Sequence, residues 1–326
     1  QCHAAQYGRD QWANDLCLAI GSAGSHGRWV HLYLNGVYWG MYNPVERPDA
    51  EFAASYYGGD PDNWDAINSG NATDGDLAAW NTLLGLAHQV DSAFGESART
   101  AAYYKLQGKN ADGTNNPLWE NYLDTENYVD YLITNFYGGN SDWPFNNYYS
   151  ARERGLDSTG FKFHMWDSEW SLGLRSNINT NRINDARGVA EPYGDLRDSA
   201  EFRLFFADRA HRALFNDGAL TADNAVERYE SILSEIDGAI EAEVGRWGDQ
   251  HNGAGYDKND WENESNLVIN NFLTGRTSVF LNQLRSAGLY ASVDAVTWNQ
   301  RGGAIGAGFD IQFAAPQGTI YYTTDG

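Results

Sequence analysis

The feature that most constrains the fold is a β-hairpin pattern between Trp29 and Tyr42. Two runs rich in β-branched and aromatic residues flank Asn35-Gly36, the dipeptide that most readily adopts the positive φ angles of a type I′ turn. The pattern predicts two antiparallel strands joined by a two-residue turn. Residues 8–20 carry apolar side chains at helical spacing and are followed by Gly21, so we expect a helix before the hairpin.

Helical patterns dominate the chain between this hairpin and Tyr290. Apolar spacing predicts helices over residues 49–57, 76–94, 96–106, 124–137, 198–245 and 264–287. Strands are expected at 147–152 and 161–166, whereas the Asp-, Asn- and Gly-rich residues 60–76 and residues 176–195 are expected to be irregular. Separate helical and strand segments of this kind indicate an α+β fold.

The sequence pattern changes after Tyr290. From residue 295 onward apolar and polar residues alternate, for example at Phe309, Ile311 and Phe313, and Gly and Pro stand at the expected turns. Such alternation predicts half-buried strands. We therefore expect residues 291–326 to be the start of a second, all-β module that packs outside the main domain.

Charge and composition restrict the function. The chain has 22 Lys and Arg against 44 Asp and Glu, a net charge of −22, and it has no basic run, so nucleic acid and anionic membrane surfaces are poor partners. No run of roughly 18 apolar residues could span a bilayer. The first ten residues contain neither Met nor the apolar run of a signal peptide, so we expect the chain to be part of a longer protein. Cys2 and Cys17 can form at most one bridge.

The densest group of polar side chains surrounds the two strand patterns in the middle of the chain. Asp142 and Asn147 are five positions apart, and Asp167 directly follows the strand expected at 161–166. The Asp-to-Asn spacing equals that of the kinase catalytic loop, in which the Asp accepts a hydroxyl proton and the Asn holds a metal ion. Asp167 then takes the place of the second metal-binding Asp. The alternatives are a turn stabilised by Asp142 and Asn147, and a salt-bridged structural role for Asp167.

Three ordered blocks of sequence resemble one known family. The blocks are His31 to Asp49, Asp142 to Tyr149, and Trp166 to Gly173. Together they resemble the CotH family of spore-coat-type atypical protein kinases, over about residues 8 to 290. The tail resembles the start of a chitobiase C-terminal-like β-sandwich module. The resemblance implies an α+β, atypical protein-kinase-like domain over residues 1–290, with its amino-terminal part missing, followed by a truncated all-β sandwich segment over residues 291–326.

The resemblance also implies an activity and a set of site residues. The activity is transfer of the γ-phosphate of ATP to Ser or Thr, with Mg²⁺ or Mn²⁺ as the metal. Carried over by position, Asp142 is the catalytic Asp, and Asn147 and Asp167 bind the metal and the nucleotide. Asn146 is the alternative register for Asn147. Glu169 stands where the family has a second Asp, and it is expected to be the third metal ligand.

One part of a kinase site is missing from the sequence, the amino-terminal lysine that holds the α- and β-phosphates. No lysine precedes Lys105, so either that lysine lies upstream, or Arg9 or Arg28 replaces it, or the chain is a pseudokinase. Lys162 alternates with phenylalanines and is expected to point to solvent. Glu46 is the expected partner of a nucleotide-orienting cation, or else forms a surface salt bridge with a neighbouring arginine. We expect weak, strictly metal-dependent ATP binding and little phosphotransfer.

Three functions are compatible with these residues, in decreasing order of support. The first is a secreted or cell-surface bacterial kinase domain whose partners are ATP and a protein substrate, with a polysaccharide as a further partner of residues 291–326. The second is a non-catalytic scaffold or binding module. The third is a carbohydrate hydrolase that uses Asp167 and Glu169. The third function has the least support. At alternate strand positions, Asp167 and Glu169 would lie about 7 Å apart on one face, and this does not place an acid and a base on opposite sides of a sugar.

Overall fold

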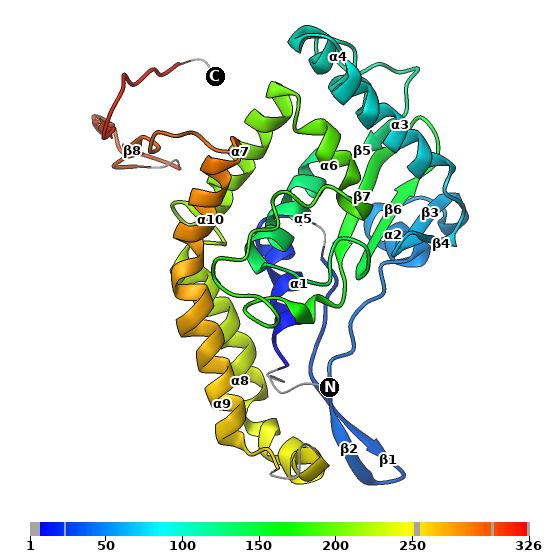
Figure 1. Ribbon diagram of the computed structural model, residues 1–326, viewed down its shortest axis with the longest axis vertical. Helices are drawn as coiled ribbons and strands as arrows, with labels where there is room; N and C mark the ends of the chain where they lie inside the picture. The colour runs from blue at the N-terminus through cyan, green and yellow to red at the C-terminus, as the bar shows by residue number, and fades with distance from the viewer. Residues whose placement is uncertain (1–6, 23, 251–254, 301–302, 325–326) are drawn as a thin grey trace.

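A five-stranded sheet forms one side of the main domain in a computed structural model, which describes residues 7–22, 24–250, 255–300 and 303–324 (Figure 1). The strand order is β4-β3-β6-β7-β5. The strands are β3 (Trp64–Asn68), β4 (Asn71–Asp74), β5 (Asn121–Leu123), β6 (Tyr148–Glu153) and β7 (Thr159–Met165). All neighbours pair antiparallel except β5, which adds to β7 in parallel. With the helices around it, this sheet makes the α+β architecture expected from the sequence.

Helices make up most of the remaining structure. They are α1 (Arg9–Ala19), α2 (Ala50–Tyr57), α3 (Ala78–Ser92), α4 (Glu96–Leu106), α5 (Thr125–Gly138), α6 (Glu191–Leu196), α7 (Ala200–Leu214), α8 (Ala222–Trp247), α9 (Lys258–Val268) and α10 (Thr274–Ser286). A π-helical turn, Ile269–Leu273, joins α9 to α10. Among the described residues, no helix combines the length and the apolar composition needed to cross a membrane.

The predicted helices are present, but three details differ from the prediction. The helix α6 begins within residues 176–195, which were expected to be irregular, and α9 begins at Lys258 rather than at residue 264. The third difference is a break in a predicted helix. The interval 198–245 contains two helices, α7 and α8, separated at residues 215–221. Asn216 has a φ of 62° there, and a Cβ on Gly218 would lie 2.4 Å from the carbonyl oxygen of Ala213. A left-handed Asn and a glycine that tolerates no side chain therefore end one helix before the next begins.

The prediction of irregular structure for residues 60–76 is wrong, because β3 and β4 lie there. Trp64 and Ala66 of β3 are buried, and β3 pairs with β6 over its whole length. Asp65 is buried as well, and its Oδ1 lies 2.6 Å from Nη2 of Arg154. An Asp in a strand is uncommon unless a distant cation compensates its charge, and a cation 89 residues away is invisible to local patterns.

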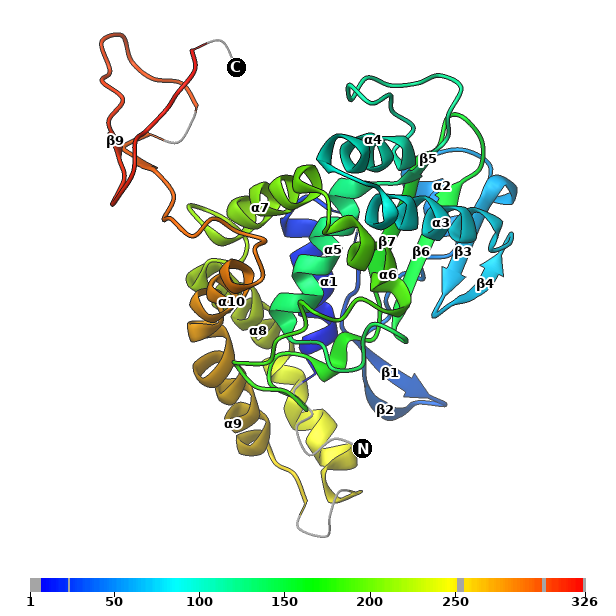
Figure 2. The same ribbon diagram turned by 45° about the horizontal axis from the view of Figure 1, so that its top comes forward.

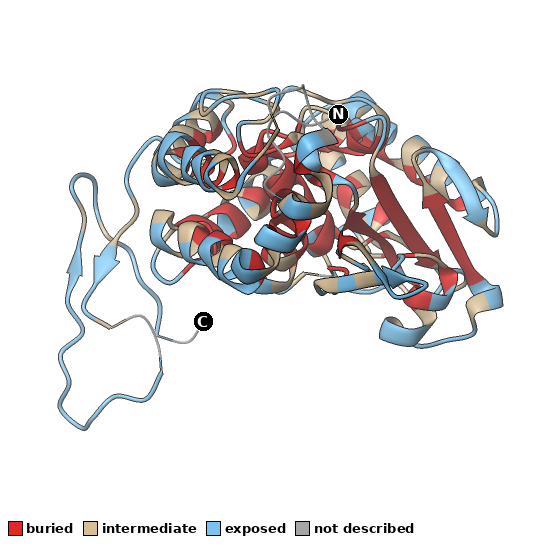
Figure 3. Ribbon diagram, turned by 90° about the horizontal axis from the view of Figure 1, so that it is seen from below, coloured by how far each residue is buried: buried red, intermediate tan, exposed pale blue. Residues whose placement is uncertain are grey.

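The two faces of the sheet are covered by different helices. On one face α5 packs its aromatic side chains against β7, and the rings of Tyr128 and Phe163 lie 4.5 Å apart. On the other face α2 packs on β3 and β6, where Ala53 contacts the small buried cluster around Ala66 and Ala151. Figure 3 shows the central strands and the inward sides of the helices in the colour of buried residues. The sheet is therefore buried on both faces along its central strands.

Cover by α2 also overturns the prediction that Lys162 points to solvent. Lys162 on β7 is 9% exposed, and its Nζ lies 2.5 Å from Oδ2 of Asp124. The ring of Tyr57, the last residue of α2, lies 5.0 Å from the ammonium group. The alternating pattern correctly places Lys162 on the opposite face of the sheet from Phe161 and Phe163. That face, however, is covered by a helix rather than by water.

The predicted hairpin is confirmed as β1 (Val30–Leu34) and β2 (Val37–Tyr42). Leu34 pairs with Val37, and the turn residues Asn35 and Gly36 have φ angles of 51° and 80°. The hairpin packs against the end of α8, whose Glu243 accepts a hydrogen bond of 2.6 Å from the backbone N–H of Met41. It forms a two-stranded sheet of its own beside the main sheet (Figure 1).

The carboxy-terminal segment extends away from α10 and from the central sheet (Figure 2). Within its described residues, β8 (Thr297–Trp298) and β9 (Phe313–Ala314) form one short antiparallel pair. Most of its other residues are exposed. Both strands have only two residues and are exposed, so the half-buried strands expected here are not observed, and a β-sandwich module stays a prediction.

Cys17 is a free, buried cysteine on α1, with its Sγ 3.6 Å from Oγ1 of Thr134. Cys2 lies outside the described residues. The structure therefore gives no support to a disulfide between Cys2 and Cys17. Cys17 instead packs as a small core residue.

One buried histidine, His164, makes the stability of the fold depend on pH. His164 on β7 is fully buried between the rings of Phe52 and Tyr57, and neither ring nitrogen has a hydrogen-bond partner among the described residues. Burial, with a smaller contribution from Lys162, lowers the pKa of His164 from 6.5 to about 3. The unfolded chain therefore takes up a proton below pH 6.5 that the folded chain does not, and stability falls as the pH falls through this window.

We expect this effect to disappear when His164 is replaced by Leu. Between pH 7 and pH 5 the wild type should lose about 2 kcal/mol more stability than His164→Leu, from 1.36 kcal/mol for each pH unit below the unfolded-state pKa. Urea unfolding at both pH values measures the difference. The exposed His31, changed to Gln, serves as the control. Equal losses in wild type and His164→Leu would contradict a neutral buried His164.

Candidate active site

The ends of β6 and β7 place two of the predicted site residues side by side. Tyr148 pairs with Met165, so Asn147, just before β6, lies beside the residues that follow β7. Asn147 and Asp167 both have left-handed backbones, with φ angles of 61° and 51°. Asn and Asp adopt this conformation more readily than other residues with side chains. The chain therefore turns sharply at both residues, at one edge of the sheet.

Asn147 links the two predicted aspartates through its side-chain amide. Its Nδ2 donates a hydrogen bond of 2.9 Å to Oδ2 of Asp142 and one of 3.2 Å to the backbone carbonyl oxygen of Asp167. Asn146, the alternative register, is exposed and makes neither bond. The structure thus brings Asp142, Asn147 and Asp167 together from two segments of the chain.

The loop that carries Asp142 is fixed by its own neighbours. The backbone N–H of Asp142 donates to Oδ1 of Asn140 at 3.2 Å, and the backbone N–H of Ser141 donates to the carbonyl oxygen of Trp170 at 2.9 Å. The second bond connects the Asp142 loop to the segment that follows Asp167. The two halves of the site therefore hold each other in place.

A buried arginine, Arg276, holds the segments next to the Asp142 loop and the loop after Asp167. Arg276 on α10 donates to the carbonyl oxygens of Tyr137 at 2.7 Å, Phe136 at 2.6 Å and Ile178 at 2.6 Å. The first two are at the carboxyl end of α5, directly before the Asp142 loop, and the third is in the loop after Asp167. Burial lowers the pKa of Arg276 to about 10, with Tyr137 opposing, so the side chain stays charged at neutral pH.

Sequence reasoning missed Asp10, an acidic residue in the first turn of α1. Its Oδ1 accepts a hydrogen bond of 2.7 Å from the backbone N–H of Ser168, the residue after Asp167. Burial first, and then the charges of Asp167 and Glu169, raise the pKa of Asp10 to about 6, against a lowering by the Ser168 bond. In the sequence, Asp10 is indistinguishable from an ordinary acid at a helix start.

The electrostatics of the site suit a divalent cation. Burial and the nearby Asp142 raise the pKa of Asp167. Burial and Asp167 also raise the pKa of Glu169, although Arg9 opposes this shift. The nitrogen of the Asn147 amide donates both hydrogen bonds, and its oxygen is of the chemical type that ligates hard cations. Carboxylate and amide oxygens are the ligands that Mg²⁺ and Mn²⁺ prefer.

Glu46 lies in a separate group of contacts. It accepts hydrogen bonds from the backbone N–H of His26 at 2.9 Å and from the hydroxyl of Tyr56 at 2.6 Å, and His26 Nδ1 is 3.0 Å away. Burial acts in the opposite direction, but these bonds hold the pKa of Glu46 below its usual value. In the described part of the chain, no hydrogen bond or ion pair joins Glu46 to Asp142 or Asp167.

The arginines considered as phosphate partners differ in position. Arg9 is buried beside Glu169, and Arg28 is exposed near the hairpin. Arg47, the neighbouring arginine expected as a salt-bridge partner of Glu46, is exposed and instead donates from Nε to the hydroxyl of Tyr149 at 2.9 Å. The ring of Tyr149 packs at 5.1 Å against Trp166, directly before Asp167. Arg47 therefore lies over the same pair of strands as the site.

Comparison with known proteins gives the family. No curated protein matches the chain. A family model described as CotH kinase protein matches residues 2–280, which include Asp142, Asn147 and Asp167 and extend from before α1 into α10. Because the match covers most of the sequence, the chain belongs to the CotH kinase protein family.

Proposed function

We propose that this chain is an atypical protein kinase domain that transfers the γ-phosphate of ATP to Ser or Thr hydroxyls of proteins. The observation that carries the proposal is the Asn147 amide, which joins Asp142 to the backbone of Asp167. A phosphotransferase needs a proton acceptor and a metal-binding carboxylate at a fixed separation, since its catalysis is mostly positioning and charge stabilisation. This contact provides such a separation.

Asp142 would act as the proton acceptor. Its Oδ2 accepts the hydrogen bond from the Asn147 amide, so Oδ1 would face the substrate hydroxyl. As the hydroxyl oxygen bonds to the γ-phosphorus and the bond from that phosphorus to the bridging oxygen breaks, the hydroxyl proton passes to Oδ1 and ADP leaves. The hydrogen bond from Asn147 orients the carboxylate for this transfer.

Asp167, Glu169 and the amide oxygen of Asn147 are the residues that would hold Mg²⁺ or Mn²⁺. When bound, such an ion neutralises the charge of the phosphate oxygens and bridges them to the protein. The left-handed turn at Asp167, fixed by the bond between Ser168 and Asp10, would hold the carboxylate in place. Glu46 would orient the nucleotide through His26, its observed partner.

A non-catalytic scaffold is the second candidate, and the positions of the lysines favour it. Lys162 pairs with Asp124 and Lys258 pairs with Asp237, while Lys109 donates to Gln107. None of the lysines that the structure describes bonds to the Asp142 and Asp167 group. A phosphate clamp would then come from an arginine or from sequence outside this chain, and without one the domain would bind rather than catalyse.

Phosphotransfer by the natural protein that carries this chain separates the two candidates. With radiolabelled ATP, Mg²⁺ and a Ser-containing acceptor, we expect labelling that Asp142→Asn slows by about 100-fold or more, because a positioned base contributes 10²–10⁴-fold. Asp112→Asn, in an exposed loop, is the matched control. Labelling that is equal in Asp142→Asn and wild type would contradict the assigned base. Absence of labelling despite bound ATP would favour the scaffold.

We further propose that the protein is secreted or displayed at a bacterial cell surface and that residues 291–326 begin a module that contacts polysaccharide. The support is the resemblance of the three sequence blocks and the tail to families of such proteins. Fractionation of cells that carry the tagged protein tests the location, and retention on insoluble polysaccharide tests the module.

A further inference from the structure

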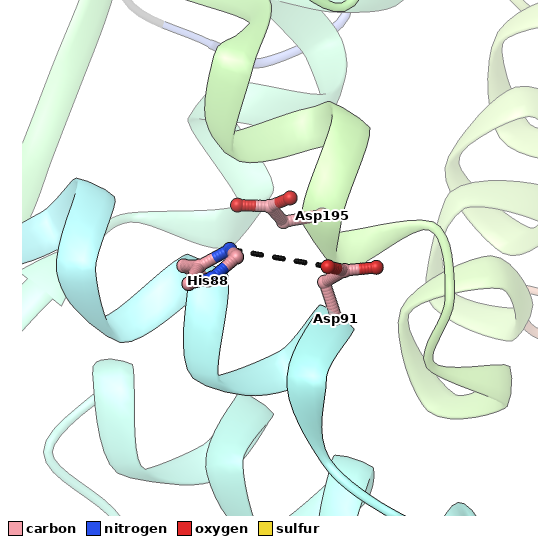
Figure 4. A group of neighbouring side chains, drawn as sticks. All are labelled: His88, Asp91 and Asp195. Carbon is pink, nitrogen blue, oxygen red and sulfur yellow. Dashed lines mark ion pairs between the residues drawn. The ribbon is translucent and has the colours of Figure 1, made fainter.

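Three side chains that can ligate metals meet between α3 and α6. His88 and Asp91 are one turn apart on α3, and Asp195 is on α6 (Figure 4). His88 Nδ1 and Asp91 Oδ2 are 3.9 Å apart, and one ligand atom from each of the three residues lies within 4.8 Å of the others. Figure 4 shows the ring and both carboxylates turned toward one point between the helices.

The charges at this point are unbalanced. Burial first, and then the carboxylate of Asp91, raise the pKa of Asp195, and Glu191 and Asp198 act in the same direction. In the described part of the chain, no lysine or arginine forms an ion pair with Asp91 or Asp195. Only His88 offers a positive charge here, and only when protonated. Two facing carboxylates from different helices repel each other unless a cation lies between them.

We propose that His88, Asp91 and Asp195 bind a divalent transition metal of the Zn²⁺ class that bridges α3 and α6. One imidazole nitrogen and two carboxylate oxygens form a three-ligand set that Zn²⁺ accepts, with water at the remaining position. Ligand atoms in a tetrahedral zinc site are about 3.4 Å apart, as bonds of about 2.1 Å require. The observed separations reach this value by rotation of the exposed His88 and Asp91 side chains.

The site would stabilise the packing of α6. This helix follows the loop that begins after Asp167, and α6 has only six residues, so its own hydrogen bonds hold it weakly. A metal that ties Asp195 to α3 would fix the far end of that loop. The proposal is independent of kinase activity, because it uses none of the residues placed in the candidate active site.

Titration with Zn²⁺ alone tests the proposal, in an Asp167→Asn background that removes the principal ligand of the other candidate metal site. We expect one equivalent of Zn²⁺ to bind in calorimetry, and we expect His88→Gln or Asp195→Asn to weaken this binding at least tenfold. His31→Gln, an exposed histidine elsewhere, should leave it unchanged. Binding that is equally strong in His88→Gln and Asp195→Asn, or absent from the background protein, would overturn the proposal.

Thermal unfolding gives a second, independent result. With a chelator present, Asp195→Asn should unfold at the same temperature as the background protein or higher, because the change removes a repulsion between carboxylates. With Zn²⁺, the background protein should gain melting temperature and Asp195→Asn should not. A purely structural role for Asp195 predicts the reverse, a lower melting temperature in chelator, and that result would overturn the metal assignment.

Discussion

Replacement of Arg276 by Met should lower the free energy of unfolding by about 3 kcal/mol or more, because three carbonyl oxygens lose their donor at about 1–3 kcal/mol each. Arg276 is fully buried and donates to the three carbonyl oxygens of Phe136, Tyr137 and Ile178. Met fills a similar volume but leaves these acceptors without donors, and each buried acceptor that loses its partner costs about 1–3 kcal/mol. The charge also lies at the negative end of the α5 dipole.

Arg203 provides the matched control for this experiment. It too donates to carbonyl oxygens at a helix end, those of Arg197 and Asp198, but it is only partly buried. Water can replace its bonds, so Arg203→Met should cost about 1 kcal/mol. Arg276→Lys should recover little, since one ammonium group does not reach three acceptors in the fork geometry of a guanidinium. Urea unfolding measures all three, and equal losses for Arg276→Met and Arg203→Met would contradict the role of Arg276.

The parts of the fold that sequence reasoning anticipated are those set by local chemistry. The hairpin was predictable because Asn35-Gly36 specifies its turn within two residues. Asn147 and Asp167 were identified from the same kind of information, namely the five-residue spacing between Asp142 and Asn147 and the position of Asp167 directly after an expected strand. Structure that is determined by a few neighbouring residues can be predicted without knowledge of the rest of the chain.

Apart from the break between α7 and α8, which Asn216 and Gly218 set locally, the parts that were missed depend on partners far away in sequence. β3 contains an Asp that is stabilised by Arg154, and Lys162 is buried because α2 covers it and Asp124 pairs with it. Asp10 contacts Ser168 across 158 positions, and Arg276 reaches α5 across 139 or more. No local pattern carries such information, because the same residues would be exposed and unremarkable if their partners lay elsewhere.

The same distinction applies to the candidate site. The positions of Asp142, Asn147 and Asp167 could be predicted from sequence, but what holds them could not. Asp10 and Arg276 support the turn and the loop without belonging to any motif. Residues that bind substrate share spacing with relatives, whereas residues that position them are chosen by the packing of each particular fold.

The largest effect on ligand binding is expected from Asp167→Ala, which should weaken ATP binding in the presence of Mg²⁺ by about 100-fold or more, beyond the 10–100-fold loss typical of residues one shell further out. ATP and the site are both negative, because the charge of Asp142 acts on Asp167 and the charge of Asp167 acts on Glu169. Binding should therefore be weak and strictly metal-dependent, with the ion bridging the phosphates to Asp167. Calorimetric titration with ATP, with and without Mg²⁺, measures this dependence.

Asp142→Ala is the matched control for Asp167→Ala, because each substitution removes one carboxylate from the same site. Asp142 serves the acceptor hydroxyl and not the metal, so its loss should leave the affinity for Mg²⁺ and ATP within about threefold of wild type, even though phosphotransfer stops. Removal of its charge also lessens the repulsion of ATP, which favours slightly tighter binding. The hydrogen bond from Asn147 to the Asp167 carbonyl remains to hold the turn. ATP binding that needs no metal and is unchanged in Asp167→Ala would contradict the assignment of the site. An equal loss of ATP affinity in Asp167→Ala and Asp142→Ala would mean that Asp142 is a metal ligand rather than the base.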